Sequence, residues 1–184
     1  MWHQDRKGRP EMWSIDDPRL LAAAMLVVIP ACSDDDDGDG GTEPATQFEA
    51  ALSGGDEVPA VTTPASGTAT LTIEGNQIVY RVEVANLENA VVSHIHVAPP
   101  GENGTVRLNL CGTPDGVPAC ASGTGVLVEG FNGNTLEITF DSLVSAIRAG
   151  NAYVNVHTDD GDDTPNTGAG DMVSGEIRGQ ITPQ

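Results

Sequence analysis

Apolar and polar residues alternate along most of the chain from residue 47 onward, in short runs separated by turn-forming residues. Successive side chains of a β-strand point to opposite faces of the sheet, so this alternation predicts strands with one buried face. The clearest runs are 68–73 and 78–84, which are joined by Glu-Gly-Asn-Gln and therefore predict a hairpin. Further strands are expected at residues 48–52, 91–98, 106–110, 126–128, 136–140, 152–158 and 174–181.

One segment, residues 141–150, departs from this alternation. Its apolar residues recur at helical spacing, Asp141 or Ser142 is expected to cap its start, and Gly150 to close its end. About nine short strands, with one short helix before the strand at 152–158, favour an all-β fold. The expected architecture is an antiparallel β-sandwich.

The N-terminal part follows a different pattern. Residues 20–29 form an unbroken apolar run, too short to span a bilayer but of the length found in a signal peptide. The run ends at Ile29, and Ile-Pro-Ala-Cys at 29–32 resembles a bacterial lipobox that ends in Cys32. Residues 33–41 are rich in Asp and Gly, which predicts a flexible tether.

These features predict an exported lipoprotein of the bacterial cell envelope, held on the lipid bilayer through acylated Cys32. The expected boundaries are a lipoprotein-type signal peptide at 1–31, an acidic tether at 32–46 and one domain at 47–183.

Charge narrows the choice of partners. The net charge is −19, and residues 1–31 hold as many basic as acidic side chains, so the rest of the chain carries the whole excess. Such a surface repels nucleic acid and attracts cations, which argues against a nucleic-acid partner. The chain also lacks the Gly-rich and nucleophile motifs of nucleotide-binding proteins and hydrolases.

Cysteine usage agrees with export. The chain has three cysteines, and once Cys32 is lipidated Cys111 and Cys120 remain as a pair at the ends of a Gly- and Pro-rich loop. Disulfides persist outside the cytosol, so we expect a disulfide between them. A two-cysteine metal site is the alternative, and the spacing disfavours it.

Three histidines carry the main candidate chemistry. His94 and His96 lie two residues apart in one predicted strand, so they share a face, and His157 shares a face with Asn155 in another. If these strands are neighbours, three imidazoles converge in a site for copper or zinc. The alternative is a structural cluster of hydrogen bonds that includes Asn155, Glu176 and Arg178.

Several spaced motifs together resemble the CHRD domain, which is named after chordin and is frequent in bacterial exported proteins. They are Leu-Ser-Gly at 52–54, Glu-Val-Pro at 57–59, His-Ile-His at 94–96, Gly-Asn-Ala-Tyr-Val-Asn-Val-His-Thr at 150–158 and Gly-Glu-Ile-Arg-Gly at 175–179. The resemblance covers roughly residues 47–182 and implies a fold family more than a function.

The chain departs from that family pattern in the acidic, Gly-rich segment 159–171. Clustered carboxylates supply the hard oxygen ligands that Ca²⁺ prefers, although the spacing is not that of an EF-hand loop. The candidate calcium ligands are Asp159, Asp160, Asp162, Asp163 and Asp171. A solvated acidic loop is the alternative.

Two classes of function stay open at this point. The first is a non-enzymatic module that binds an envelope or extracellular protein or a glycan. The second is a copper- or zinc-binding protein, either a carrier or a redox enzyme. No catalytic residues are predicted, because Ser93 is expected to face away from His94 and no other pair of nucleophile and base stands out.

Overall fold

The computed structural model describes residues 44–113, 117–131, 138–162 and 168–184. The predictions for the signal peptide, for Cys32, for most of the tether and for Asp163 lie outside these residues. The fold is all-β, as expected, with nine strands and one short α-helix in the described ranges. The strands are β1 (Gln47–Ser53), β2 (Ser66–Glu74), β3 (Gln77–Leu87), β4 (Ala90–Val97), β5 (Thr105–Cys111), β6 (Gly123–Phe131), β7 (Ala152–Thr158), β8 (Ile177–Gln180) and β9 (Thr182–Pro183).

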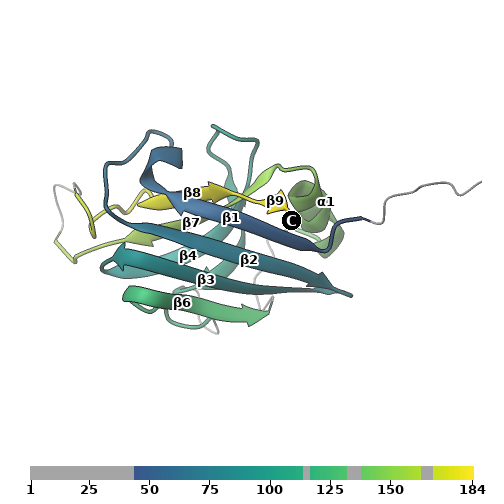
Figure 1. Ribbon diagram of the computed structural model, residues 1–184, viewed down its shortest axis with the longest axis horizontal. Helices are drawn as coiled ribbons and strands as arrows, with labels where there is room; N and C mark the ends of the chain where they lie inside the picture. Colours follow the sequence, from purple (N-terminus) through teal and green to yellow (C-terminus); the bar gives the residue numbers. More distant parts are fainter. Residues whose placement is uncertain (1–43, 114–116, 132–137, 163–167) are drawn as a thin grey trace, which may run out of the picture. The chain divides into compact units, whose positions relative to one another are not determined.

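All strand pairs are antiparallel, and the order across the sheet is β5-β4-β7-β8-β1-β2-β3-β6, with β9 beside β1 (Figure 1). The end strands β5 and β6 also contact each other, so the sheet folds into a nearly closed barrel. The Tyr80 hydroxyl of β3 donates to the carbonyl of Leu110 in β5, which links strands near the two ends of the sheet. This order places the two histidine-bearing strands, β4 and β7, side by side.

The core is built from the inward-facing positions of the strands, as the alternation predicts. Ile95 of β4, Val154 of β7 and Ile177 of β8 are fully buried members of it. The intervening residues of the same three strands therefore point to the outer face of the sheet. That outer face carries the candidate site.

The predicted hairpin is confirmed, since β2 and β3 pair from Ser66–Ala85 to Glu74–Gln77, and Gly75 adopts φ +58° in the turn. Gly has no Cβ to oppose this left-handed conformation. The last predicted strand, 174–181, is shorter than expected: β8 spans Ile177–Gln180, and residues 174–176 are not in a strand. The chain then continues into β9, which pairs with β1.

Two details of the predicted helix region are wrong. The helix α1 spans Phe140–Arg148, so Phe140 starts a helix instead of ending a strand, and residues 138–139 are not in a strand. The N-cap is Thr139, whose hydroxyl accepts a hydrogen bond from the Ser142 amide. Gly150 closes the helix as expected, with φ +69° and its amide bonded to the Ile147 carbonyl.

Cys111 at the end of β5 forms the predicted disulfide with Cys120, so these two cysteines are not a metal site. No helix within the described ranges combines the length and the hydropathy needed to cross a membrane.

Candidate metal centre

The candidate site lies on the outer face of β4, β7 and β8. Residues directly opposite in an antiparallel pair point to the same face. His94 is opposite Asn155, His96 is opposite Tyr153, and Val92 is opposite His157. The period-two pattern of two adjacent strands therefore brings all three histidines to one face.

The three rings form a small cluster, in which His94 meets each of the other two in a T-shaped arrangement. Ring centroids are 5.6 Å apart for His94 and His96, 5.2 Å for His94 and His157, and 6.1 Å for His96 and His157. One ring nitrogen from each histidine lies within 4.8 Å of the corresponding nitrogen of the others. Nitrogens bound to one ion at 2.0–2.1 Å lie about 3.4 Å apart in a tetrahedral site. The nitrogens therefore need to approach one another by at most about 1.4 Å to share an ion.

Each ring of the cluster has one buried nitrogen that makes no hydrogen bond to the described residues. His96 Nδ1 is 3.0 Å from the Gly104 carbonyl and His157 Nδ1 is 2.9 Å from the Val173 carbonyl. A carbonyl only accepts, so each Nδ1 carries the proton and each Nε2 keeps a lone pair. His96 Nε2, His157 Nε2 and His94 Nδ1 are buried and have no hydrogen-bond partner within the described part of the chain.

Burial keeps the cluster uncharged. Desolvation, together with the smaller effects of the neighbouring His157 and His96, lowers the pKa of His94 to about 4. Desolvation also lowers the pKa of His96 and of His157, although the hydrogen bonds to Gly104 and Val173 act in the opposite direction. All three imidazoles are therefore neutral at pH 7, which is the form that binds a metal ion.

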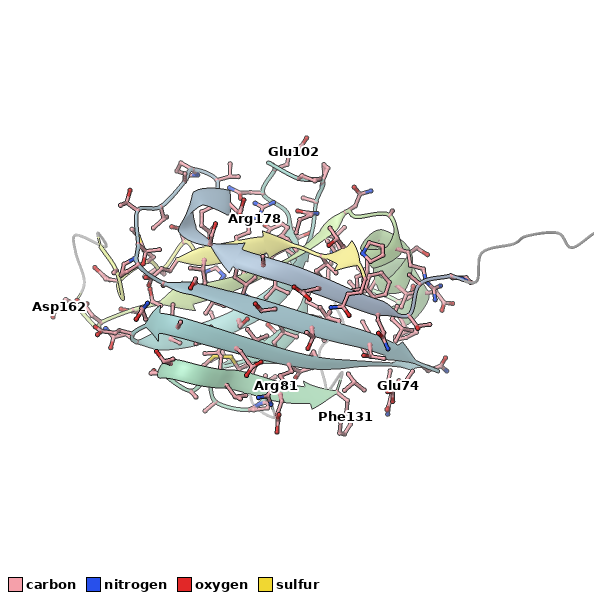
Figure 2. All side chains as sticks on the ribbon, viewed as in Figure 1. Glu74, Arg81, Glu102, Phe131, Asp162 and Arg178 are labelled. Carbon is pink, nitrogen blue, oxygen red and sulfur yellow. A yellow bond between two sulfur atoms is a disulfide. The ribbon has the colours of Figure 1, made fainter. Side chains whose placement is uncertain are left out.

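Tyr153 and Arg178 extend the cluster along the same face. The Tyr153 ring is stacked on His96, with centroids 4.9 Å apart and an angle of 8° between the planes. The Arg178 guanidinium lies 3.4 Å from the Tyr153 ring centroid, a cation–π contact. Arg178 also donates to the Glu102 carbonyl and to Asn103 Oδ1, so the loop between β4 and β5 covers this end of the site (Figure 2).

A second loop, after β1, brings a buried carboxyl to the same face. Desolvation raises the pKa of Glu57 to about 7, while Arg178 and Asn155 act to lower it. A Cβ added at Gly175 would lie 2.7 Å from Glu57 Oε1 and from both amide atoms of Asn155, so any side chain here would have to displace these two side chains. Gly175 also has φ +124°, which favours glycine for a separate reason.

Glu176 belongs to a neighbouring network and does not touch the histidine rings in any contact of the described residues. Its side chain is fully buried and accepts hydrogen bonds from Thr63 Oγ1, Thr158 Oγ1 and the Gly170 amide. Thr158 in turn accepts from the Met172 amide. This network holds the loop at 168–175, and that loop supplies the Val173 carbonyl to His157.

The structure brings together only part of the predicted calcium set. Carboxylate oxygens of Asp159, Asp160 and Asp171 lie within 4.8 Å of one another, whereas Asp162 is not in this group. Asp159 and Asp160 also accept hydrogen bonds from the amides of Gly161 and Asp162, respectively, two residues on. Such bonds are typical of turns, so these side chains have a structural role without an ion.

Residues 48–165 match the family model of the CHRD domain. The chain belongs to the CHRD domain family. No curated protein and no solved structure matches the chain. The match includes β1 to β7 and hence all three histidines of the cluster, while Arg178 and Glu176 lie beyond it.

Sequence reasoning missed several parts of the site in this CHRD domain. Tyr153 gave a usable signal, because it alternates with Asn155 and His157 and so shares their face. Glu57, Gly104 and Val173 gave none, since each lies in a loop and meets the site only through the fold.

Proposed function

We propose that this CHRD domain binds one transition-metal ion, copper or zinc, between His94, His96 and His157. The observation that carries the proposal is that each of the three rings brings one nitrogen to within 4.8 Å of the others, in a cluster where each ring also has a buried nitrogen with no hydrogen-bond partner in the described residues. An unpaired buried polar atom costs free energy, and an ion bound to all three removes that cost. Imidazole nitrogen is a ligand that suits both metals.

The surroundings support a preorganised site. Two of the three rings are fixed by hydrogen bonds from Nδ1 to a backbone carbonyl, which is the usual outer-shell partner of a metal-bound histidine. The lowered pKa values mean that few protons must be released when the ion binds at pH 7.

We propose a binding module and not an enzyme. Ser93, which directly precedes His94, is fully buried and donates to the Asn155 carbonyl. It is therefore not paired with an imidazole as a catalytic nucleophile would be. An envelope or extracellular protein or a glycan remains the partner class proposed for the rest of the surface.

Calorimetric titration of tag-free protein with Cu²⁺ or Zn²⁺ tests the metal site. We expect one ion per chain, and loss of binding in His96→Ala and in His157→Ala, because two neutral nitrogens hold an ion far more weakly than three. Asn76→Ala, in the exposed turn between β2 and β3, is the control and should bind as the parent does. Binding that survives both cluster variants but is lost in Asp159→Asn with Asp171→Asn would move the site to the carboxylates.

We also propose that the protein is exported and anchored to the bacterial cell envelope by lipid on Cys32. The apolar run at 20–29, the cysteine that follows it and the acidic segment behind the cysteine support this proposal. The Cys111–Cys120 disulfide agrees with it, because such bonds persist in oxidising compartments.

Cys32→Ser should release the protein from the membrane, because the acceptor of the lipid is lost. Fractionation of cells expressing the full chain measures this, with Ser33→Ala as a matched control that stays in the membrane fraction. Equal membrane association of Cys32→Ser and the parent would refute the anchor and leave the metal site unaffected.

A further inference from the structure

A buried positive charge lies one aromatic ring away from a proposed metal ligand. In the sheet order, β7 lies between β4 and β8. Tyr153 of β7 is accordingly stacked between His96 of β4 and Arg178 of β8, at centroid distances of 4.9 Å and 3.4 Å. Any charge that the histidines take up is therefore opposed by the guanidinium.

Little in the structure neutralises this guanidinium. Arg178 is 2% exposed, and its hydrogen bonds go to neutral acceptors, the Glu102 carbonyl and Asn103 Oδ1. The two ion pairs found in the described ranges both belong to Arg81, on the distant face of β3 (Figure 2). The acid that acts on Arg178 is Glu57, whose pKa is raised to about 7 by burial, so it is only partly ionised at neutral pH.

The histidines themselves bring no compensating charge. Three neutral imidazoles leave the full charge of a bound ion in place, so a divalent ion adds two positive charges beside Arg178 and a monovalent ion adds one. The cost of placing like charges near each other in a poorly solvated site grows with the charge of the ion. Among the candidate metals, copper has a stable monovalent form.

We propose that the three-histidine centre prefers monovalent copper to divalent copper and zinc, and that Arg178 creates this preference across the Tyr153 ring. The inference rests on the metal site proposed above and adds the oxidation state that the site selects. Arg178 is a positioning and charge-setting residue here, since it does not contact the ion.

The size of the effect follows from Coulomb's law. A unit charge about 10 Å away, at an effective dielectric constant of about 20, changes an affinity by roughly tenfold for each charge on the ion. Removing the charge of Arg178 should therefore raise the affinity for Cu²⁺ and Zn²⁺ more than that for Cu⁺. The ratio of Cu⁺ to Cu²⁺ affinity should fall by roughly tenfold, equivalent to about 59 mV in the one-electron potential of bound copper.

The experiment measures the Cu⁺ and Cu²⁺ affinities of the full chain separately, by competition with chelators of known affinity, Cu⁺ under anaerobic conditions. Arg178→Gln removes the charge, whereas Arg178→Lys retains it. We expect the affinity ratio to fall roughly tenfold in the glutamine variant and to stay within about threefold of the parent in the lysine variant.

A second variant avoids disturbing a buried residue. Asn103 is exposed and its Oδ1 lies 3.2 Å from Arg178 Nη1, so Asn103→Asp adds a carboxylate next to the guanidinium. We expect the ratio to fall by about threefold or more. Asn103→Ala controls for the hydrogen bond from Asn103 to the Val58 carbonyl, which aspartate also loses. Asn76→Asp, in the exposed turn between β2 and β3, adds the same charge away from the site.

The outcomes separate the two proposals. Loss of metal binding in the histidine variants, with an unchanged ratio in Asn103→Asp and Arg178→Gln, would overturn the role of Arg178 alone. An equal shift in Asn76→Asp would assign the effect to the net charge of the protein and would also overturn it. Absence of histidine-dependent metal binding in the parent would overturn the metal site and, with it, this inference.

Discussion

Replacing Glu176 with alanine is expected to lower the free energy of unfolding by about 3–5 kcal/mol. The carboxylate is fully buried and accepts hydrogen bonds from Thr63, Thr158 and the Gly170 amide. Alanine leaves these three donors without this acceptor, and two of them, the Thr158 hydroxyl and the Gly170 amide, are buried. Each unpaired buried donor costs about 1–3 kcal/mol.

The same substitution should also weaken metal binding. Without Glu176 the loop at 168–175 loses the Gly170 contact and the ordered Thr158 hydroxyl that holds the Met172 amide. The Val173 carbonyl then no longer fixes His157, and loss of such an outer-shell partner typically lowers metal affinity 10–100-fold.

Urea unfolding of the metal-free chain measures the loss of stability, and calorimetric titration measures the loss of metal affinity. Glu176→Gln keeps the shape and one acceptor oxygen, so it should fall between the parent and the alanine variant. Glu74→Ala, at an exposed strand end, is the matched control and should change the free energy of unfolding by less than about 0.5 kcal/mol. An alanine variant as stable as this control would show that the network does not stabilise the fold.

The alternation of apolar and polar positions was sufficient to predict the side of the sheet on which the histidines lie. His94 and His96 share a face because Ile95 between them is a core residue, and the same holds for Asn155 and His157 around Val156. Their convergence needed one further fact, that β4 and β7 are neighbours, and nothing local to either strand encodes it. The sequence therefore predicted the three-histidine site only on the condition that the two strands are neighbours.

The loops that surround the site could not be predicted from the pattern of side chains, for a physical reason. The carbonyls that fix the rings, at Gly104 and Val173, belong to backbone that any residue provides. Their positions depend on loops whose conformation is set by long-range contacts, such as Arg178 to Glu102 and Glu176 to Gly170. The alternation at 175–179 was sufficient to predict that Arg178 pairs with an acid or a backbone carbonyl near the histidines, as it does with the Glu102 carbonyl, but it did not identify the loop that supplies the partner.

The error at the start of α1 has a local origin. Leu136 to Phe140 alternates as a strand does, yet Phe140 begins the helix. Thr139 is a favourable N-cap residue, and its hydroxyl competes with strand pairing by accepting the Ser142 amide. Alternation over five residues was weaker evidence than the capping residue within them.

The metal-free protein is expected to lose stability as the pH falls from about 6.5 to about 4, because its three histidines are buried in the neutral form. In this range the unfolded chain takes up protons at an ordinary histidine pKa, whereas the folded chain does not, since desolvation lowers the pKa of His94 to about 4 and also lowers those of His96 and His157. The unfolded state then binds more protons, so the free energy of unfolding decreases with falling pH. For His94 alone, the loss between pH 6.5 and pH 4 amounts to about 2–3 kcal/mol.

Glu57 changes stability with pH in the opposite direction, so its contribution has to be separated from that of the histidines. Its folded-state pKa is raised to about 7 from 4.5, so its contribution to stability is present below pH 4.5 and is lost as the pH rises towards 7. Glu57→Gln removes this contribution, and in that background the acid-induced loss from the histidines should be steeper than in the parent.

Urea unfolding at intervals between pH 4 and pH 8, in the presence of a chelator, measures the acid effect. His94→Gln in the Glu57→Gln background is the matched comparison, because it removes one histidine and keeps the rest of the cluster. The gap in unfolding free energy between the two should change by about 2–3 kcal/mol between pH 7 and pH 4. Parallel pH profiles would mean that His94 titrates alike in the folded and unfolded chains. Saturating zinc or copper should delay the loss to lower pH, because the ion competes with protons for the same nitrogens and stabilises only the folded state.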